Sequence, residues 1–163
     1  MNMTLDVTEC FIQCPFENAI QRLYYSGKKR RHTIKYEIGI HLQSSKIVWL
    51  NGGIPGSVHD LTIVRNSGLL SNLFPGELVL SNKTYIGEIY FYHSIKPAIT
   101  IEKKQFNSAI SSIRETVEHT IHRIKIFGFT QQKWRYNLNL HSIAFSVICH
   151  TLNIEFIAHP VHQ

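Results

Sequence analysis

The segment from residue 32 to residue 42, HTIKYEIGIHL, places the strongest limit on what this chain can fold into. Apolar and polar side chains alternate along it with a period of two residues, which is the period of a half-buried β-strand. One face carries Ile34, Tyr36, Ile38, Ile40 and Leu42, and the other carries Thr33, Lys35, Glu37 and His41. We therefore predict a strand with one face in the core of a sheet.

The rest of the chain predicts strands first and long helices later. Residues 4–13 and 46–51 suit strands on either side of residues 32–42, and the short links indicate an antiparallel meander. After Ser57, which with Asp60 resembles a helix N-terminus, the patterns predict a helix over 58–71, strands over 78–81 and 96–100, and helices over 105–127 and 139–157.

This order of elements is that of the ribonuclease H-like α/β fold. Its mixed five-stranded sheet has the order 3-2-1-4-5, so strands 1 and 4 are neighbours, about 4.8 Å apart. Acidic residues at the ends of those strands can share a metal ion with a third residue from a long helix packed on the sheet. The corresponding positions here hold Asp6, Asn82 and Glu118.

Size and charge narrow the class of protein. A chain of 163 residues is long enough for one core, so we expect a single domain over residues 1–163. Its net charge of +6 favours polyanionic partners. Three cysteines favour a reducing compartment over a disulfide framework. Because we found no apolar run near the roughly 20 residues of a membrane span, we expect no membrane partner.

Five segments, in order, resemble the catalytic domain of the DDE superfamily endonucleases of Harbinger-type transposases. They are LYYSGKKRRHTIK (23–35), GIPGSVHDLTIVRNSGLL (53–70), VLSNKTYIG (79–87), RETVEHTIHRIK (114–125) and SVICHTLN (146–153). The resemblance covers about residues 5 to 157 and implies a DNA endonuclease that uses Mg²⁺ or Mn²⁺. It further implies DNA as partner, a Myb-like DNA-binding protein and a homo-oligomer as candidate partners, and a nuclear location in a eukaryote or a cytoplasmic one otherwise. The family's N-terminal helix-turn-helix region is expected to be absent from this chain.

A helix signature supports this resemblance. Arg114, Glu118 and Lys125 have the spacing of a signature shared with bacterial insertion-sequence transposases, although Ser111 replaces its usual Tyr. At 100° per residue these three side chains share one helix face, where a carboxylate between two cations suits a metal-bound phosphodiester. The alternative is a solvated face with ion pairs four residues apart.

The three acidic positions of the family do not all hold acids here. Asp6 lies in LDVTE, which resembles the family's DGT with Val7 for Gly, and Glu118 is the acid of the helix. Resembling chains have Asp where this one has Asn82. A neutral amide removes one of about three negative charges that attract the metal ion. We therefore predict impaired catalysis, with an inactive relic that binds DNA or a protein as the alternative.

Asp60 allows two interpretations. After Ser57 it suits a capping box and complements the helix dipole, whereas direct metal ligation is the alternative. Strand order places it at an edge strand, roughly 10 Å from strand 1, which favours the capping or supporting role.

Candidate DNA contacts form two groups. The loop residues Lys28, Lys29, Arg30 and Arg31 suit phosphate contacts, with a nuclear import signal or a solvated loop as alternatives. The helix residues are Arg114, Arg123 and Lys125. In addition, residues 133–136, KWRY, pair cations with aromatic rings that can stack on bases.

Overall fold

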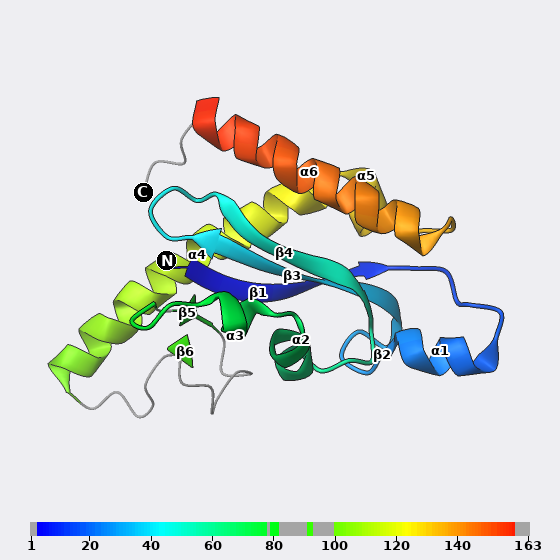
Figure 1. Ribbon diagram of the computed structural model, residues 1–163, viewed down its shortest axis with the longest axis horizontal. Helices are drawn as coiled ribbons and strands as arrows, with labels where there is room; N and C mark the ends of the chain where they lie inside the picture. The colour runs from blue at the N-terminus through cyan, green and yellow to red at the C-terminus, as the bar shows by residue number, and fades with distance from the viewer. Residues whose placement is uncertain (1–2, 78, 82–90, 93–99, 159–163) are drawn as a thin grey trace.

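The computed structural model describes residues 3–77, 79–81, 91–92 and 100–158, and a mixed sheet forms its centre (Figure 1). The strand order is β4–β3–β1–β5–β6, with the short β2 paired to the start of β3. β1 and β4 are both antiparallel to β3, while β5 is parallel to β1 and to β6. The bounds are β1 Met3–Phe11, β2 Tyr25–Ser26, β3 Arg31–His41, β4 Ile47–Pro55, β5 Val79–Leu80 and β6 Phe91–Tyr92.

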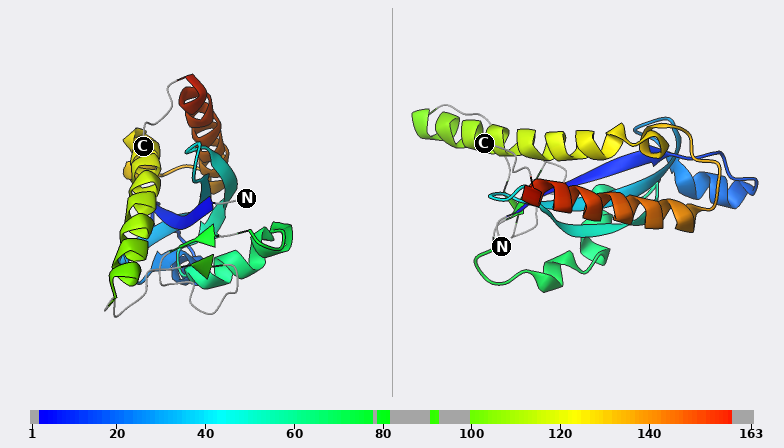
Figure 2. Two further views of the ribbon diagram at one scale, coloured as in Figure 1. Left: turned by 90° about the vertical axis from the view of Figure 1, so that its left-hand side faces the viewer. Right: turned by 90° about the horizontal axis from the view of Figure 1, so that it is seen from above.

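Helices cover both faces of this sheet (Figure 2). α4 (Ile101–Ile126) and α6 (Leu138–Ala158) pack on one face, and α2 (Asp60–Asn66) and α3 (Leu69–Asn72) pack on the other. Two short helices complete the chain, α1 (Asn18–Tyr24) after β1 and α5 (Gly128–Gln131) after α4. The result is a mixed α/β fold that is compatible with the ribonuclease H-like arrangement.

The predicted meander and strand order agree with the structure, but several boundaries differ. The strand beside β5 is β6, and the predicted strand over 96–100 lies outside the described residues except for Thr100, which caps α4. The predicted helix over 58–71 is divided into α2 and α3 at Gly68, which has a φ of +81°. The prediction missed α1.

The predicted capping role of Ser57 is wrong. Residues 55–58 form a turn in which the Val58 N–H donates to the Pro55 carbonyl at 3.1 Å, so the helix begins later. α2 starts at Asp60, and His59 is its N-cap without a side-chain hydrogen bond.

β3 is buried on both faces, which differs from the half-buried strand that its alternation predicts. The cause is that α2 and α3 cover the polar face, whose side chains find internal partners. The Lys35 ammonium pairs with the Asp60 carboxylate at 3.0 Å, and the indole N–H of Trp49 donates to Glu37 at 2.7 Å. The alternation of apolar and polar residues thus identified the two faces of β3 correctly, but it did not predict that the polar face is buried.

Tyr36 joins the sheet to α6. Its ring stacks on Phe145 with centroids 3.8 Å apart, and its hydroxyl forms a 2.7 Å hydrogen bond with Nδ1 of His141. Burial lowers the pKa of His141 to about 4, so the imidazole is neutral at neutral pH. On β4 the backbone of Gly52 lies directly against the Tyr36 ring, which leaves no room for a side chain there.

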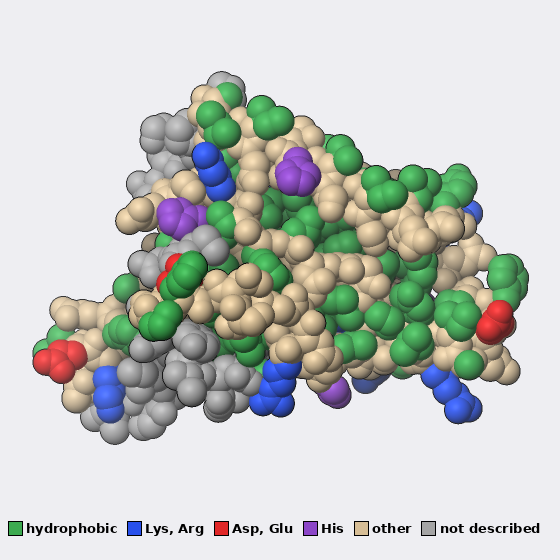
Figure 3. Space-filling model, in the orientation of Figure 1, with side chains coloured by type: hydrophobic (Ala, Val, Ile, Leu, Met, Phe, Trp, Pro, Cys, Tyr) green, Lys and Arg blue, Asp and Glu red, His purple; other side chains and the backbone are tan. Residues whose placement is uncertain are grey.

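α6 is long and apolar enough to cross a membrane by length and composition, which differs from the expectation that no apolar run approaches the length of a membrane span. One side of it packs on the core through residues that include Phe145, Ile148 and Leu152. The other side leaves apolar residues exposed, and Figure 3 shows hydrophobic side chains along this helix. The packing identifies α6 as a core helix with an apolar outer surface.

We predict that Gly52→Ala destabilises the fold by about 1–3 kcal/mol, because a Cβ atom there overlaps the Tyr36 ring, which Phe145 and His141 hold in place. Urea unfolding followed by circular dichroism measures the effect. Gly27→Ala is the matched control, because nothing lies within 4 Å of a Cβ at Gly27. Equal unfolding midpoints for the two variants would contradict the prediction.

Candidate active site

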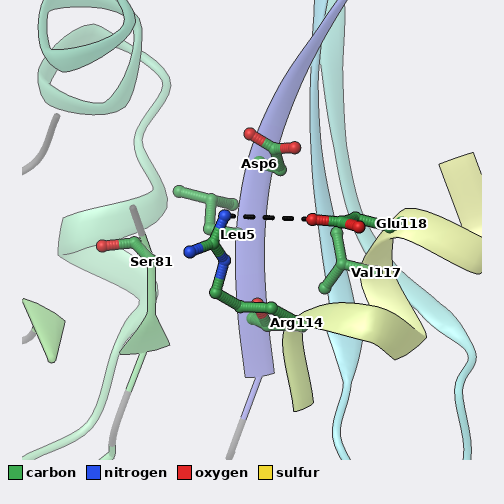
Figure 4. A pocket seen from close by; sticks show the side chains of 7 residues that line it. Leu5, Asp6, Ser81, Arg114, Val117 and Glu118 are labelled. Atoms are coloured by element: carbon green, nitrogen blue, oxygen red, sulfur yellow. Dashed lines mark ion pairs between the residues drawn. The ribbon is translucent and has the colours of Figure 1, made fainter. Parts of the chain in front are cut away.

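A small cavity forms where β1, the end of β5 and the middle of α4 meet (Figure 4). Its volume is about 20 Å³, enough for one water molecule or one ion. The lining residues are Thr4, Leu5, Asp6, Ser81, Arg114, Val117 and Glu118. The structure thus brings together Asp6, Glu118 and Arg114, which the sequence predicted as site residues, and adds Ser81 and Thr4.

The strand pairing explains why the cavity forms at this place. Within the residues that the structure describes, β1 and β5 pair through Met3 with Val79 and Thr4 with Leu80. Leu5, Asp6 and Ser81 follow these pairs directly, so they lie where the described ladder ends. α4 packs against this point through the buried side chain of Val117, which positions the next residue, Glu118, beside β1.

Asp6 occupies an environment that opposes its charge. Burial raises the pKa of its carboxyl group above the ordinary value, and the negative charge of Asp60 raises this pKa further. The Val7 amide, which donates to Oδ1 of Asp6 at 2.9 Å, and the cations of Lys28 and Arg114 act in the opposite direction. Such a carboxylate gains from an added cation, because a positive charge offsets the loss of hydration.

Glu118 lies nearby but is exposed. Arg114 and Glu118 form an ion pair between Nη2 and Oε1 at 3.9 Å, and their side chains are 44% and 69% exposed. A pair so exposed is weak, since water screens it. Glu118 can therefore exchange Arg114 for another cation at little cost in free energy.

Lys125, which the sequence predicts as a DNA contact, fixes α4 to β1. Its ammonium donates to the carbonyl of Glu9 and lies 3.4 Å from the sulfur of Cys10 and from the carbonyl of Thr130. Lys125 lies two helical turns after Glu118, about 10.5 Å along the helix. Glu9 lies three residues after Asp6, about 10 Å along the strand. Because these spacings match, the Lys125 contact places Glu118 next to Asp6.

Arg123 also makes contacts inside the fold. Its guanidinium lies 3.4 Å from Glu155 and 5.2 Å from the centre of the Phe156 ring, so it links α4 to α6. The sequence signature groups Lys125 with the acid and the sequence analysis adds Arg123 as a candidate DNA contact, but the structure gives both residues internal partners. Their contact with DNA stays a prediction.

Lys28, Lys29 and Arg30 of the basic loop, and Arg31 at the first position of β3, are all exposed. Lys28 and Lys29 line a groove of about 390 Å³ together with Lys125 and β1 residues from Val7 onward. Lys28 is close enough to lower the pKa of Asp6. The loop thus adds positive charge beside the cavity.

Asp60 is outside the cavity and already has a partner. It is the first residue of α2, where a negative charge suits the helix dipole, and it pairs with the largely buried Lys35. Its effect on the pKa of Asp6 shows that it acts on the cavity through its charge. The sequence shows Lys35 on the polar face of a strand, but this position alone does not predict that Asp60 is its partner.

The chemistry of the donors fits a hard divalent cation only in part. Asp6 and Glu118 offer carboxylate oxygens, the ligands that Mg²⁺ and Mn²⁺ prefer. Asn82 follows Ser81 in the sequence but lies outside the described residues. Within the part of the chain that the structure describes, no group of three or more His, Cys, Asp or Glu residues could hold a metal ion.

We predict that Lys125→Met lowers the free energy of unfolding by about 1.5–3 kcal/mol, because it removes hydrogen bonds from a charged group to β1. Lys104→Met, at an exposed position of the same helix, is the control and should change stability little. Chemical denaturation of both variants measures the difference. If Lys125→Met is as stable as the parent, the prediction is wrong, and Lys125 would serve ligand binding and not the stability of the fold.

We predict that Asp6→Asn stabilises the protein at pH 7. The pKa of Asp6 is higher in the folded state than in the unfolded chain, so the folded state binds the proton of this carboxyl group more tightly. The stability of the parent therefore falls as the pH rises from the unfolded-state pKa of Asp6 to its folded-state pKa. The gain should vanish below the ordinary pKa of about 3.9. Urea midpoints at pH 7 and pH 3.5 measure it, with the exposed Glu118→Gln as control. A loss of stability at pH 7 would refute the burial argument.

Comparisons with known proteins agree with this geometry. The model of the DDE superfamily endonuclease family matches residues 5–153. The probable transposase for insertion sequence element IS702 of Microchaete diplosiphon is 30% identical, over 94% of this chain and 56% of its own length. This chain therefore spans about half the length of that relative. No solved structure matches.

The family match fixes the general class and leaves the Harbinger subtype as a prediction. Nucleases of the DDE superfamily generally use divalent metal ions, and transposase-like nucleases act on DNA. The match covers β1 from Leu5 onward, including Asp6, and α6 as far as Asn153. The chain belongs to the DDE superfamily endonucleases and is a transposase-like DDE endonuclease domain.

Proposed function

We propose that this chain is a transposase-derived, divalent-metal-dependent DNA endonuclease domain of the Harbinger type with a ribonuclease H-like fold. In this proposal Asp6 and Glu118 hold the metal ion, and Asn82 weakens the site. The observation that carries the proposal is that Asp6 and Glu118, distant in the sequence, line one ion-sized cavity. The strand order supports the fold assignment.

Each described residue has a role in this proposal. Asp6 is oriented by the Val7 amide and, being largely buried, gains from a neighbouring cation. Glu118 supplies the second carboxylate from α4 and releases Arg114 easily. A bound Mg²⁺ or Mn²⁺ would supply positive charge to the phosphodiester oxygens and lower the pKa of a bound water. Arg114 and Lys28 would hold the flanking phosphates.

Asn82 sets the expected level of activity. An amide oxygen can coordinate Mg²⁺, but it brings no negative charge, and much of the binding of hard cations comes from carboxylate charge. Asp60 is a candidate for partial compensation, although its pairing with Lys35 favours a supporting electrostatic role. We therefore propose that the parent sequence binds the metal ion weakly.

A second candidate function follows from the same position. With Asn82 in place of an acid, the domain would serve as an inactive relic that binds DNA or a protein such as a Myb-like partner. The exposed Lys28–Arg31 loop favours this candidate, because its positive charge does not depend on catalysis. A homo-oligomer is compatible with either function.

We predict that Asn82→Asp nicks supercoiled plasmid in Mn²⁺ and Mg²⁺ at least about tenfold faster than the parent, because the restored charge strengthens metal binding. The double variant Asn82→Asp with Glu118→Ala should be inactive, which excludes a contaminating nuclease. Isothermal titration with Mn²⁺ gives a second measurement and should show tighter binding by Asn82→Asp.

Two results would change the proposal. Nicking by the parent that depends on Glu118 would show that Asn82 suffices, and Asp60→Asn would then test the alternative ligand. If Asn82→Asp neither nicks DNA nor binds Mn²⁺ more tightly, the relic function is favoured.

A further inference from the structure

The segment between α5 and α6 lies at the opposite end of β1 from its pairing with β5 (Figure 1). Residues of α5 and of this segment line a second hollow. Its volume is about 470 Å³, within the range of ligand pockets. Three aromatic rings and two cations line it: Phe129, Trp134, Tyr136, Lys133 and Arg135. We call this hollow the aromatic pocket.

The rings of the aromatic pocket are held in a defined arrangement. The indole N–H of Trp134 donates to the carbonyl of Asn137 at 3.0 Å, and this ring meets Phe129 and Tyr136 edge-on with centroids 5.7 and 5.3 Å apart. Tyr136 is 74% exposed. Trp134 therefore forms a fixed wall, and Tyr136 presents an open ring face to a ligand.

The charge of the pocket indicates the class of ligand. Lys133 and Arg135 are exposed on either side of Trp134, and the described lining contains no Asp or Glu. Cations beside an accessible ring are the combination that binds nucleotides, since phosphates meet the cations and a base stacks on the ring. An ordinary peptide has neither a regular negative charge nor a planar base.

The backbone connects this pocket to the candidate active site. Trp134 forms a parallel bridge to Ile12, in which its N–H donates to Phe11 at 2.9 Å and its carbonyl accepts from Gln13 at 2.7 Å. Ile12 is six residues after Asp6, so the pocket lies about 20 Å along the strand from Asp6. The groove with Lys28, Lys29 and Lys125 lies between them and shares the α5 region with the pocket.

We propose that the aromatic pocket is a second nucleic-acid site that holds an unpaired DNA base about 20 Å along β1 from Asp6, with Tyr136 stacked on the base and Lys133 and Arg135 at the adjacent phosphates. A paired base has both faces occupied within the duplex, so the pocket selects single-stranded DNA. The identity of the ligand as DNA rests on the proposed function, but binding here requires neither a metal ion nor catalysis.

The test is fluorescence anisotropy of a labelled 12-nucleotide oligothymidine with the full chain in EDTA. Tyr136→Ala should weaken binding about 5- to 100-fold, the effect of losing one stacked base, and Tyr136→Phe should retain parental affinity. Phe74→Ala, which removes a ring that is 71% exposed outside this pocket, is the matched control and should bind like the parent. A duplex of the same length should respond little to Tyr136→Ala.

Salt dependence tests the cations separately. The double variant Lys133→Gln with Arg135→Gln should reduce the slope of log K against log salt concentration by about 1.4 for the single strand, because two phosphate contacts are lost. An unchanged slope would overturn the role of these two residues in phosphate binding.

Several results would overturn the inference. They are a Tyr136→Ala affinity for the single strand within twofold of the parent, an equal loss in Phe74→Ala or Tyr136→Phe, and an equal loss of duplex affinity in Tyr136→Ala. Tyr136-dependent binding of an oligoglutamate peptide of equal charge would assign the pocket to a protein partner instead. Since these measurements are made in EDTA, failure of Asn82→Asp to nick plasmid would overturn the catalytic proposal alone.

Discussion

The contact between the Lys125 ammonium and the backbone of β1 determines where the acids of this domain meet. A long helix can slide along a sheet by one turn with small changes in apolar packing, because such packing is not directional. A partly buried ammonium bonded to a particular carbonyl allows only one position. With α4 held in this position, Glu118 lies beside Asp6, and the cavity between them follows from the backbone geometry of the two elements.

The same region shows how stability and chemistry conflict. Asp6 is held in surroundings that raise its pKa, and it has Asp60 as a negatively charged neighbour. Such an arrangement costs folding free energy, which the apolar clusters on the two faces of the sheet offset. Burial of this carboxyl group near a second negative charge makes Asp6 a candidate functional residue, because groups with perturbed pKa values gather at functional sites.

The order of the first four predicted strands and the meeting of Asp6 with Glu118 followed from matching the chain order of elements to the ribonuclease H-like fold and from the family resemblance, because periodicity identifies strands and helices but not which of them are neighbours. The sequence did not predict the burial of the polar face of β3, since the partners of Lys35 and Glu37 come from elements after the strand. It also did not predict the hydrogen bonds of Lys125 to β1, because angular position on a helix does not reveal which side chains reach a neighbouring strand. The start of α2 was missed since the turn at residues 55–58 takes precedence over the cap at Ser57.

The position of Lys125 has a consequence for how relics of mobile elements are recognised. A signature that contains both a metal-binding acid and a lysine that anchors the fold records two different requirements. Mutation can remove the chemistry at one position while the need to fold preserves the other. A copy that no longer moves can thus keep most of the signature for as long as its folded domain is useful to the host. Membership of the family therefore indicates common ancestry and a folded domain, whereas the acidic residues indicate whether the domain is active.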